Sequence, residues 1–265
     1  MGVRNVVRQA ADRVTTWLDD HFAADGRCRI DPDDPRYYVK APYLLHAAGL
    51  RRKASACAHL VASRFIDDSG DLIADIPLDN RVYGMGWLCL GGIATERFDL
   101  ANAVGGRLEQ LQDPQSGGIL LPDAQAGEAV GEVCFSGGAG MALAAAGRVA
   151  AARRMADRFV SMLEDQPEAG RYYNRFRADG SVVPRPAPPP WEKVYDRELD
   201  EQRPATFATV VNTLVWTGRA VREDEYFRAA RRYVDLVYDH RLDPSGFGRA
   251  TKFGWAMLNL HDDAG

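Results

Sequence analysis

Apolar segments alternate along the chain with segments in which charged residues recur at helical spacing. Each apolar segment is nearly uniform in hydrophobicity, which is typical of a helix buried on all sides. The intervening segments, such as RRKASACAHLVASRF and REDEYFRAARRYVDLVYDH, place their charges on one helical face. The pattern predicts pairs of a buried inner helix and an amphipathic outer helix. The inner segments are APYLLHAAGL, GMGWLCLGGIA, SGGAGMALAAAGR, FATVVNTLVWTGR and KFGWAMLNLHDDAG.

A turn rich in Asp and Gly closes each of these units. Asp, Ser and Gly favour tight turns, and a glycine at the end of an inner segment, as at Gly49, Gly147 and Gly218, fits a helix C-cap. The regular recurrence predicts a repeat of helical hairpins, with a plain antiparallel helix bundle as the alternative. The turn glycines are Gly26, Gly70, Gly117, Gly180 and Gly246.

Stacked hairpins of this kind predict an all-α fold, an α/α toroid (barrel) of five to six helical hairpins with short β-hairpin turns. We expect residues 1–265 to form a single domain. A stretch from about 181 to 204 contains six prolines, which favours an extended, stiff loop. This loop is either a lid or a disordered linker, and Trp191 and Tyr195 within it favour packing. Since five hairpins are counted, either the ring is incomplete or this segment takes the place of a sixth hairpin.

Two phrases resemble known toroids. QDPQSGGILL resembles the Q-D-x-x-G-G-F type turn of the terpenoid-cyclase and prenyltransferase α/α toroids, and YGMGWLCLGG and TKFGWAMLNL look like inner helices of the six-hairpin superfamily. The resemblance is architectural and spans most of the chain, although the chain is short for six hairpins. Asp31, Asp33 and Asp34 resemble the D-x-D-D protonating motif of class II terpene cyclases, but Pro35 and Arg36 depart from it and favour a helix cap instead.

Composition excludes several classes of function. The 33 basic and 37 acidic residues are balanced and dispersed, which excludes a nucleic-acid surface. No apolar run is long enough to span a membrane, and the charged N-terminus is no secretory signal, so we expect a cytoplasmic protein with reduced cysteines. No spacing indicates a metal site, a nicotinamide or a flavin, so no cofactor is expected. A homo-oligomer stays open.

The polar groups that precede the inner helices are expected to meet at the mouth of the funnel. Glu132 lies four residues before the third inner segment, which begins at Ser136. Burial disfavours the charged form of a carboxyl group, so Glu132 is the candidate proton donor or base. Gly137, Gly138 and Gly140, which interrupt the following helix, indicate either close helix packing or room for a ligand.

Aromatic and basic residues complete the predicted site. Tyr83 and Trp87 are four residues apart, hence on one helical face, and an aromatic wall suits an apolar or carbocation-like substrate. Arg203 and Lys252 are expected to anchor an anionic end of the substrate. The candidate catalytic residues are Glu132, Tyr83, Tyr38 and Tyr173, and the candidate substrate-binding residues are Asp79, Trp87, Cys134, Arg203, Lys252 and Trp255.

These residues predict a cofactor-independent enzyme that isomerises, cyclises or dehydrates a small organic molecule, terpenoid- or polyketide-like, by acid–base chemistry. One alternative is a carbohydrate-active toroid, a glycoside hydrolase or sugar epimerase, with carboxylates such as Asp79 and Glu132 paired across the funnel. The other is a non-catalytic toroid that binds a peptide or another subunit.

Overall fold

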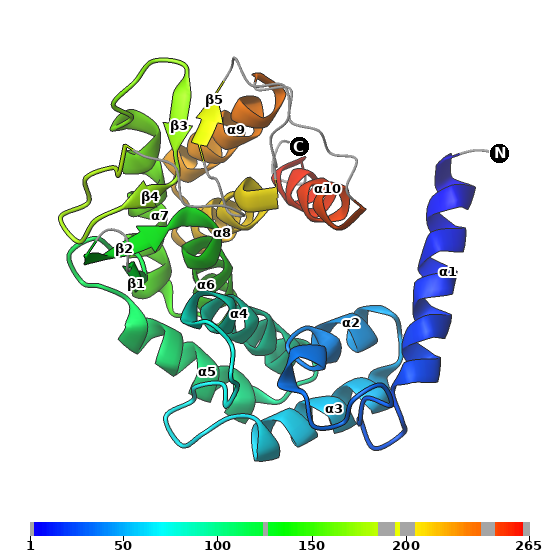
Figure 1. Ribbon diagram of the computed structural model, residues 1–265. Coiled ribbons are helices and arrows are strands. Elements are labelled where there is room, and N and C mark those ends of the chain that lie inside the picture. Colours follow the sequence, from blue (N-terminus) through cyan, green and yellow to red (C-terminus); the bar gives the residue numbers. More distant parts are fainter. Residues whose placement is uncertain (1–2, 124–126, 185–193, 197–204, 240–246, 262–265) are drawn as a thin grey trace. The chain divides into compact units, whose positions relative to one another are not determined.

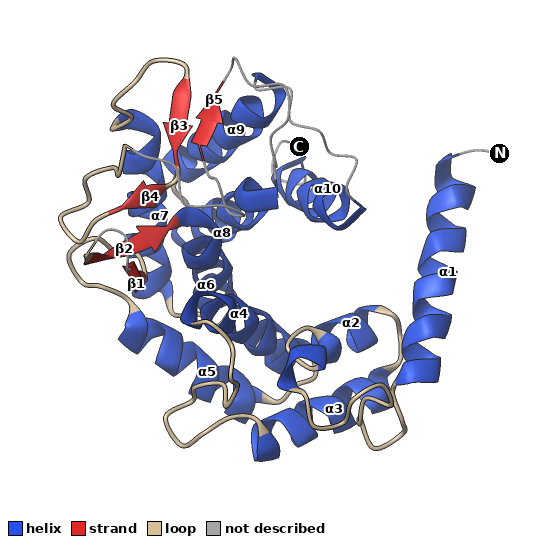
Figure 2. Cartoon of the chain, in the orientation of Figure 1, coloured by secondary structure: helices blue, strands red, loops and turns tan. Residues whose placement is uncertain are grey.

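The computed structural model describes residues 3–123, 127–184, 194–196, 205–239 and 247–261. Helices dominate the described chain and the strands are short (Figures 1 and 2), which confirms the predicted all-α class. The chain forms two compact units, residues 1–108 and 109–265, and each is described by itself. The prediction of one domain therefore stays a prediction.

The first unit is built from helices alone, with one short 3-10 turn. Helix α2 packs against both α3 and α4, so the second apolar segment lies beside the first, as the hairpin pattern predicts. Its elements are α1 (Val3–His21), η1 (Pro35–Tyr37), α2 (Ala41–Ala47), α3 (Arg51–Arg64), α4 (Leu78–Ala94) and most of α5 (Phe98–Leu111).

The second unit is centred on α8, which packs against α6, α7, α9 and α10. Strands β1, β2 and β4 form an antiparallel sheet in that order, and β3 pairs with β5. The elements are β1 (Leu120–Asp123), β2 (Glu128–Glu132), α6 (Val133–Ala145), α7 (Val149–Glu164), β3 (Arg171–Tyr173), β4 (Arg175–Phe176), β5 (Val194–Asp196), α8 (Ala205–Val221), α9 (Asp224–Asp239) and α10 (Phe247–His261).

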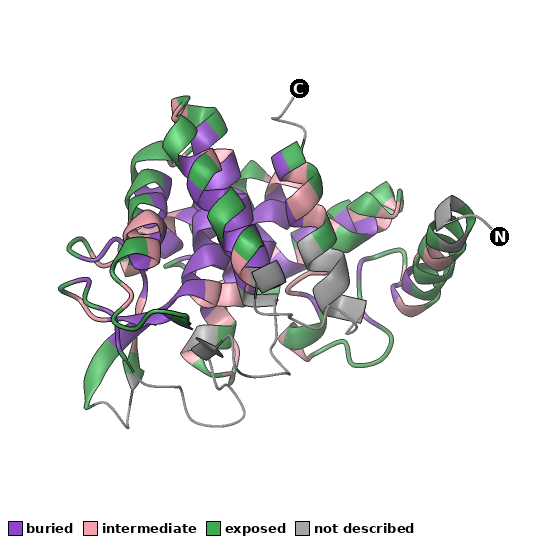
Figure 3. Ribbon diagram, turned by 90° about the horizontal axis from the view of Figure 1, so that it is seen from above, coloured by how far each residue is buried: buried purple, intermediate pink, exposed green. Residues whose placement is uncertain are grey.

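Burial separates the two kinds of helix as the sequence predicts, with two exceptions. Helices α4, α6 and α8 are buried along most of their described length, whereas α7 and α9 bury one face. Figure 3 shows both kinds of helix, some buried almost throughout and others with one buried face. The first and last apolar segments are not buried on all sides, because Leu44 of α2 is 40% exposed and Leu258 of α10 is 66% exposed. That part of the prediction is wrong, since mean apolarity does not show whether a second layer covers a helix.

The predicted Asp and Gly turns are present at all four described positions. Gly26, Gly70, Gly117 and Gly180 have φ values of 83°, 82°, 73° and 86°, in the left-handed region that favours glycine. Each turn closes an antiparallel bridge between the residues on its two sides, for example between Phe22 and Cys28. The fifth turn glycine, Gly246, lies outside the described residues.

Three of these turns lie against the backbone of a later outer helix. A Cβ atom on Gly26 would overlap the backbone nitrogen of Cys57 in α3, one on Gly70 the carbonyl oxygen of Ala103 in α5, and one on Gly117 that of Arg154 in α7. The turn that follows each outer helix therefore packs on the next outer helix. This is a repeat in contacts as well as in sequence.

The inner helices end in two ways. Gly49 and Gly147, with φ values of 77° and 72°, end α2 and α6 as predicted, whereas Glu96 and Arg222, each with φ of 59°, have this conformation after α4 and α8. The prediction for Gly218 is wrong, because α8 continues to Val221. Gly218 instead lies where a Cβ would be 3.0 Å from the ring of Phe227, so its small size serves the packing of α8 on α9.

The proline-rich stretch is described only in part. Residues 181–184 follow the fourth turn, and Val182 bridges to Phe176. Residues 185–193 and 197–204, which include Trp191, lie outside the described residues. Between them, Val194–Asp196 forms β5 and pairs with β3, with Tyr195 opposite Tyr172.

Candidate functional site

Glu132 lies where a strand passes directly into an inner helix. It is the last residue of β2 and the N-cap of α6, and its backbone is extended, with φ of −139° and ψ of 133°. The Phe135 N–H donates to its Oε2 (3.2 Å) and the Asn174 amide Nδ2 donates to its Oε1 (3.1 Å). The residue is 6% exposed. Its carboxylate is therefore buried and held in one orientation by hydrogen-bond donors on both oxygens.

Asn174 and Arg175 bring the opposing strand to this carboxylate. Arg175 lies directly opposite Glu132 in the β2–β4 ladder and is 7% exposed. Asn174 is fully buried, and its main-chain carbonyl accepts a hydrogen bond from the Val133 N–H (3.0 Å). We call Glu132, Asn174 and Arg175 the Glu132 cluster.

The Asn174 side chain has one satisfied and one unsatisfied end. A carboxylate only accepts hydrogen bonds, so the amide Nδ2 must face Glu132. The Oδ1 atom then points elsewhere, and it is buried with no hydrogen-bond partner among the described residues. A buried acceptor without a donor costs about 1–3 kcal/mol. A ligand hydroxyl or amine that donates to this oxygen would recover that cost.

The Glu132 side chain lies beside a basic residue and at the N-terminus of a helix. Opposite charges directly across an antiparallel pair attract, and the positive end of the α6 dipole favours an anion at its N-terminus. A buried charge is tolerated when such partners are present. A basic residue, a helix N-terminus and two donated hydrogen bonds therefore surround the Glu132 carboxyl group.

The glycines of α6 serve helix packing. A Cβ on Gly137 would be 2.8 Å from Oγ1 of Thr209, and one on Gly140 would be 2.6 Å from Cγ2 of Thr213. The Thr213 hydroxyl donates to the carbonyl of Gly137 (2.8 Å). Of the two interpretations of these glycines, close packing of α6 on α8 is the one that the structure shows, and α8 fills the room that a ligand would need.

Two of the predicted residues, Tyr83 and Trp87, lie in α4 of the first unit, beside residues at the start of α2. The rings of Tyr83 and Trp87 meet edge to face with centroids 6.3 Å apart, and the Tyr43 ring contacts Trp87 at 5.6 Å. The Lys40 ammonium lies 5.0 Å from the centre of the Tyr83 ring and 5.4 Å from that of Trp87. We call Lys40, Tyr43, Tyr83 and Trp87 the Lys40 cluster.

The hydroxyl of Tyr38 is engaged in the first turn. It accepts a hydrogen bond from the Cys28 N–H (2.9 Å) and donates to the carbonyl of Pro32 (3.0 Å). Burial raises the pKa of Tyr38. These contacts tie the C-cap of η1 to the segment that follows the Gly26 turn, so a structural role accounts for Tyr38 and we leave it out of the site.

The hydroxyl of Tyr173 is also engaged away from Glu132. It donates to Oε1 of Glu168 (2.8 Å), and this hydrogen bond, with a smaller effect of burial, raises the pKa of Tyr173. The main chain of Tyr173 bonds the Gln166 side chain through both its N–H and its carbonyl. Although Tyr173 precedes Asn174 in the chain, its hydroxyl serves the loop that precedes β3.

The remaining predicted substrate-binding residues are dispersed. Cys134 is the second residue of α6 and is half-buried. Its main-chain carbonyl accepts a hydrogen bond from the Thr209 hydroxyl (3.2 Å). The Trp255 ring of α10 meets that of Trp216 edge on at 5.5 Å. Asp79 belongs to α4 and Lys252 to α10, with side chains outside the described part, and Arg203 lies outside the described residues altogether.

The D-x-D-D motif caps a helix, as the sequence favours. Oδ1 of Asp34 accepts from the Arg36 N–H (2.9 Å), and the same side chain forms an ion pair with the Arg36 guanidinium, whose hydrogen bond lowers the pKa of Asp34. Oδ1 of Asp31 accepts from the N–H of Asp33 (3.1 Å). These carboxylates are therefore occupied by backbone and arginine donors.

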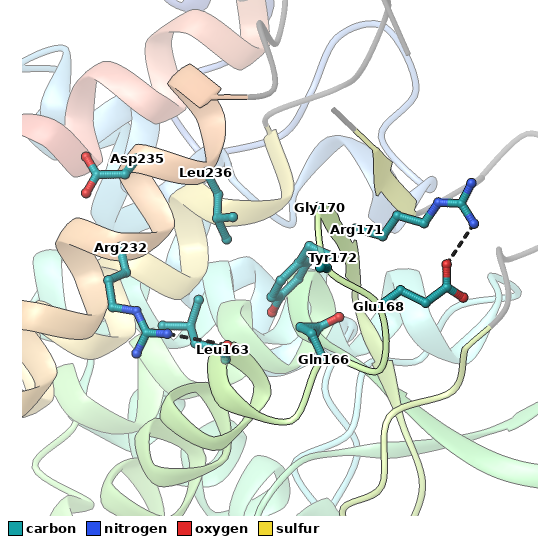
Figure 4. A pocket seen from close by; sticks show the side chains of 10 residues that line it. Leu163, Gln166, Glu168, Gly170, Arg171, Tyr172, Arg232, Asp235 and Leu236 are labelled. Carbon is teal, nitrogen blue, oxygen red and sulfur yellow. Dashed lines mark hydrogen bonds and ion pairs between the residues drawn. The ribbon is translucent and has the colours of Figure 1, made fainter. Parts of the chain in front are cut away.

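A pocket of about 460 Å³ lies between the end of α7, β3 and α9 (Figure 4). Both arginines that line it form ion pairs: Arg171 bonds Glu168 (2.8 Å), and Arg232 approaches Glu164 (3.5 Å), which lies outside the lining. The four side chains of these two pairs are about half exposed, so water screens them. The pocket contains none of the predicted site residues.

Four residues of the two clusters are not among the candidate site residues that the sequence predicts: Asn174, Arg175, Lys40 and Tyr43. Asn174 reaches Glu132 only through the pairing of β2 with β4, and no local motif marks that register. Lys40 is the N-cap of an inner helix, as Glu132 is. Its position before the first apolar segment could therefore have marked Lys40 as a candidate site residue.

Among the described residues, no group of three or more His, Cys, Asp or Glu side chains has the arrangement of a metal site. Searching the described helices for one of sufficient length and apolarity to cross a membrane finds none. Comparison with protein-family models, with curated proteins and with solved structures finds no match to this chain.

Proposed function

We propose that this protein is an enzyme that performs acid–base chemistry on a small organic molecule at the Glu132 cluster, with isomerisation, cyclisation or dehydration as the reaction types. One observation carries the proposal: a buried carboxylate is fixed by Asn174, whose own Oδ1 is buried without a donor. That pairing gives a proton acceptor beside a hydrogen-bond acceptor for the substrate.

Each residue of the cluster then has a role. Glu132 takes a proton from the substrate and returns it at a second atom. Asn174 accepts a hydrogen bond from a substrate hydroxyl or amine through Oδ1 and holds the carboxylate through Nδ2. Arg175, opposite Glu132 in the ladder, offsets negative charge that develops on the substrate as the proton leaves.

Exchange of substrate protons with solvent tests this proposal without knowledge of the product. The protein is incubated in D2O with panels of hydroxy acids, sugars and unsaturated alcohols, and deuterium incorporation is followed by NMR. The Glu132→Gln variant keeps the size of the side chain but cannot take a proton, so incorporation should fall by about 10²–10⁴-fold. Glu128→Gln is the control, because Glu128 begins the same strand but is exposed and pairs with Arg177.

Loss of exchange supports the assignment only if Glu132→Gln has the same melting temperature as the native protein. The Glu132→Asp variant retains a carboxyl group and should keep part of the exchange. Equal exchange by Glu132→Gln and the native protein would refute the assignment. The panel also separates the alternatives. Hydrolysis or epimerisation of sugars alone favours the carbohydrate-active enzyme, and no exchange with any panel favours the non-catalytic binding protein.

We further propose that the helical hairpins follow an α/α toroid. The support is the repeated packing of each turn on the next outer helix, at Gly26, Gly70 and Gly117, together with the alternation of buried and half-exposed helices. Small-angle X-ray scattering tests it. A ring predicts that the particle shape reconstructed from the scattering curve has reduced density at its centre. A shape of uniform density, as for a solid helix bundle, would contradict the proposal.

A further inference from the structure

The Lys40 cluster joins the start of α2 to the middle of α4, within the first unit. Lys40 is the N-cap residue of α2 and makes no side-chain cap, so its side chain is available to the rings of α4. Tyr83 and Trp87 lie one helical turn apart, and Tyr43 follows Lys40 on the first turn of α2. Lys40, Tyr43 and Tyr83 are half-buried and Trp87 is buried. The cluster is thus partly shielded from water and partly open to it.

The ammonium of Lys40 has aromatic neighbours but no carboxylate partner. Its Nζ lies 5.0 Å and 5.4 Å from the centres of the Tyr83 and Trp87 rings, within cation–π range. Among the described residues no Asp or Glu oxygen lies within 4.0 Å of it. By contrast, Nζ of Lys53 lies 2.6 Å from Oδ1 of Asp19. Lys40 is therefore a half-buried positive charge that aromatic faces hold in place and that no described anion neutralises.

We propose that the Lys40 cluster binds a small organic anion with a planar apolar body, an aromatic carboxylate being the simplest such ligand. The carboxylate pairs with the Lys40 ammonium, and the body lies against the rings of Tyr43, Tyr83 and Trp87. A charge-assisted hydrogen bond is stronger where water is partly excluded, and stacked or edge-on aromatic contacts add to it. This inference does not depend on the acid–base function, because it concerns binding within the first unit.

Three probes that share one ring system and differ in charge test the proposal: 2-naphthoate, 2-naphthalenemethanol and 2-naphthylmethylammonium. Binding to the full-length protein is measured by titration calorimetry and tryptophan fluorescence. We expect 2-naphthoate to bind more tightly than the neutral alcohol, with an affinity that weakens as salt is added. The Lys40→Met variant should lose about tenfold to hundredfold in affinity for 2-naphthoate, whereas Lys40→Arg should keep most of it.

The matched control is Lys53→Met, which removes another lysine of the first unit, one that is paired with Asp19, and should leave the affinity unchanged. Tyr83→Leu should weaken the binding of all three probes, because it removes ring surface rather than charge. The proposal is overturned if 2-naphthylmethylammonium binds best, if Lys40→Met binds 2-naphthoate as the native protein does, or if 2-naphthoate shows no saturable binding. Because binding rather than proton exchange is measured, the result is independent of the Glu132 test.

Discussion

Replacing Gly117 by alanine separates the two reasons for glycine in the repeated turns. Gly117 has φ of 73°, and a Cβ there would overlap the carbonyl oxygen of Arg154 in α7 and lie 3.0 Å from its carbonyl carbon. Gly147, after α6 in the same unit, has almost the same φ of 72° but no atom within 4 Å of the added Cβ. The two substitutions therefore carry the same backbone strain and differ in packing.

The expected magnitudes follow from that comparison. A non-glycine residue in the left-handed region costs about 1–2 kcal/mol, so Gly147→Ala should lower the free energy of unfolding by about that amount. Gly117→Ala adds an overlap with backbone, which cannot rotate away, and overpacking of this kind costs about 1–3 kcal/mol. We expect Gly117→Ala to be destabilising by about 2–5 kcal/mol in total.

Urea unfolding followed by circular dichroism measures both variants, with the slope of the transition checked for equality. A difference of about 1 kcal/mol corresponds to roughly 2–4 °C in the melting temperature of a chain of this size, so a thermal scan gives an independent value. Equal losses for the two variants would show that backbone conformation alone demands glycine, and the docking of the turn on α7 would then contribute nothing to stability.

Two further predictions concern buried polar groups in the second unit. Gln112 donates to the carbonyls of Gly117 (2.7 Å) and Ala151 (2.9 Å), so Gln112→Ala leaves two acceptors unsatisfied and should cost about 2–4 kcal/mol by urea unfolding, whereas the exposed Gln115→Ala should cost almost nothing. Burial raises the pKa of Tyr233 above its unfolded value of about 10. Its contribution to stability is therefore complete below pH 10 and is lost at about 1.4 kcal/mol per pH unit as the pH rises beyond it, since the unfolded state releases the proton first; the Tyr233→Phe variant should show a smaller decline between pH 10 and 11, and an unchanged decline would contradict the assignment.

The extent to which the sequence predicts this molecule depends on how far apart the interacting residues are. The Asp and Gly turns were predictable, because the aspartate that accepts the turn's N–H groups lies within a few residues of the glycine, as Asp67 does of Gly70. The Glu132 cluster was predictable only in part. Glu132 can be recognised in the sequence because it precedes an apolar run. Asn174 cannot, because it is 42 residues away and reaches Glu132 only through the pairing of two strands.

The sequence could not decide whether the glycines of α6 serve helix packing or ligand binding, and the cause here is different. A small residue in a buried helix is compatible with a neighbouring helix or with a ligand, and the sequence of α6 is the same in both cases. Only the position of Thr213, 76 residues after Gly137 and bonded to its carbonyl, decides for the helix. The assignment of Gly218 failed for a related reason, because a glycine near a helix end is required either for φ or for packing, and here Phe227 requires the space.

The repeated turns also bear on how the chain reaches its fold. Each of the three turns at Gly26, Gly70 and Gly117 meets a helix fewer than 40 residues further along, at Cys57, Ala103 and Arg154. Contacts of such short sequence separation close small loops, which favours rapid folding. During synthesis from the N-terminus, each turn can therefore dock as soon as the next outer helix has left the ribosome, so that the protein grows by successive additions and need not wait for the C-terminal helix.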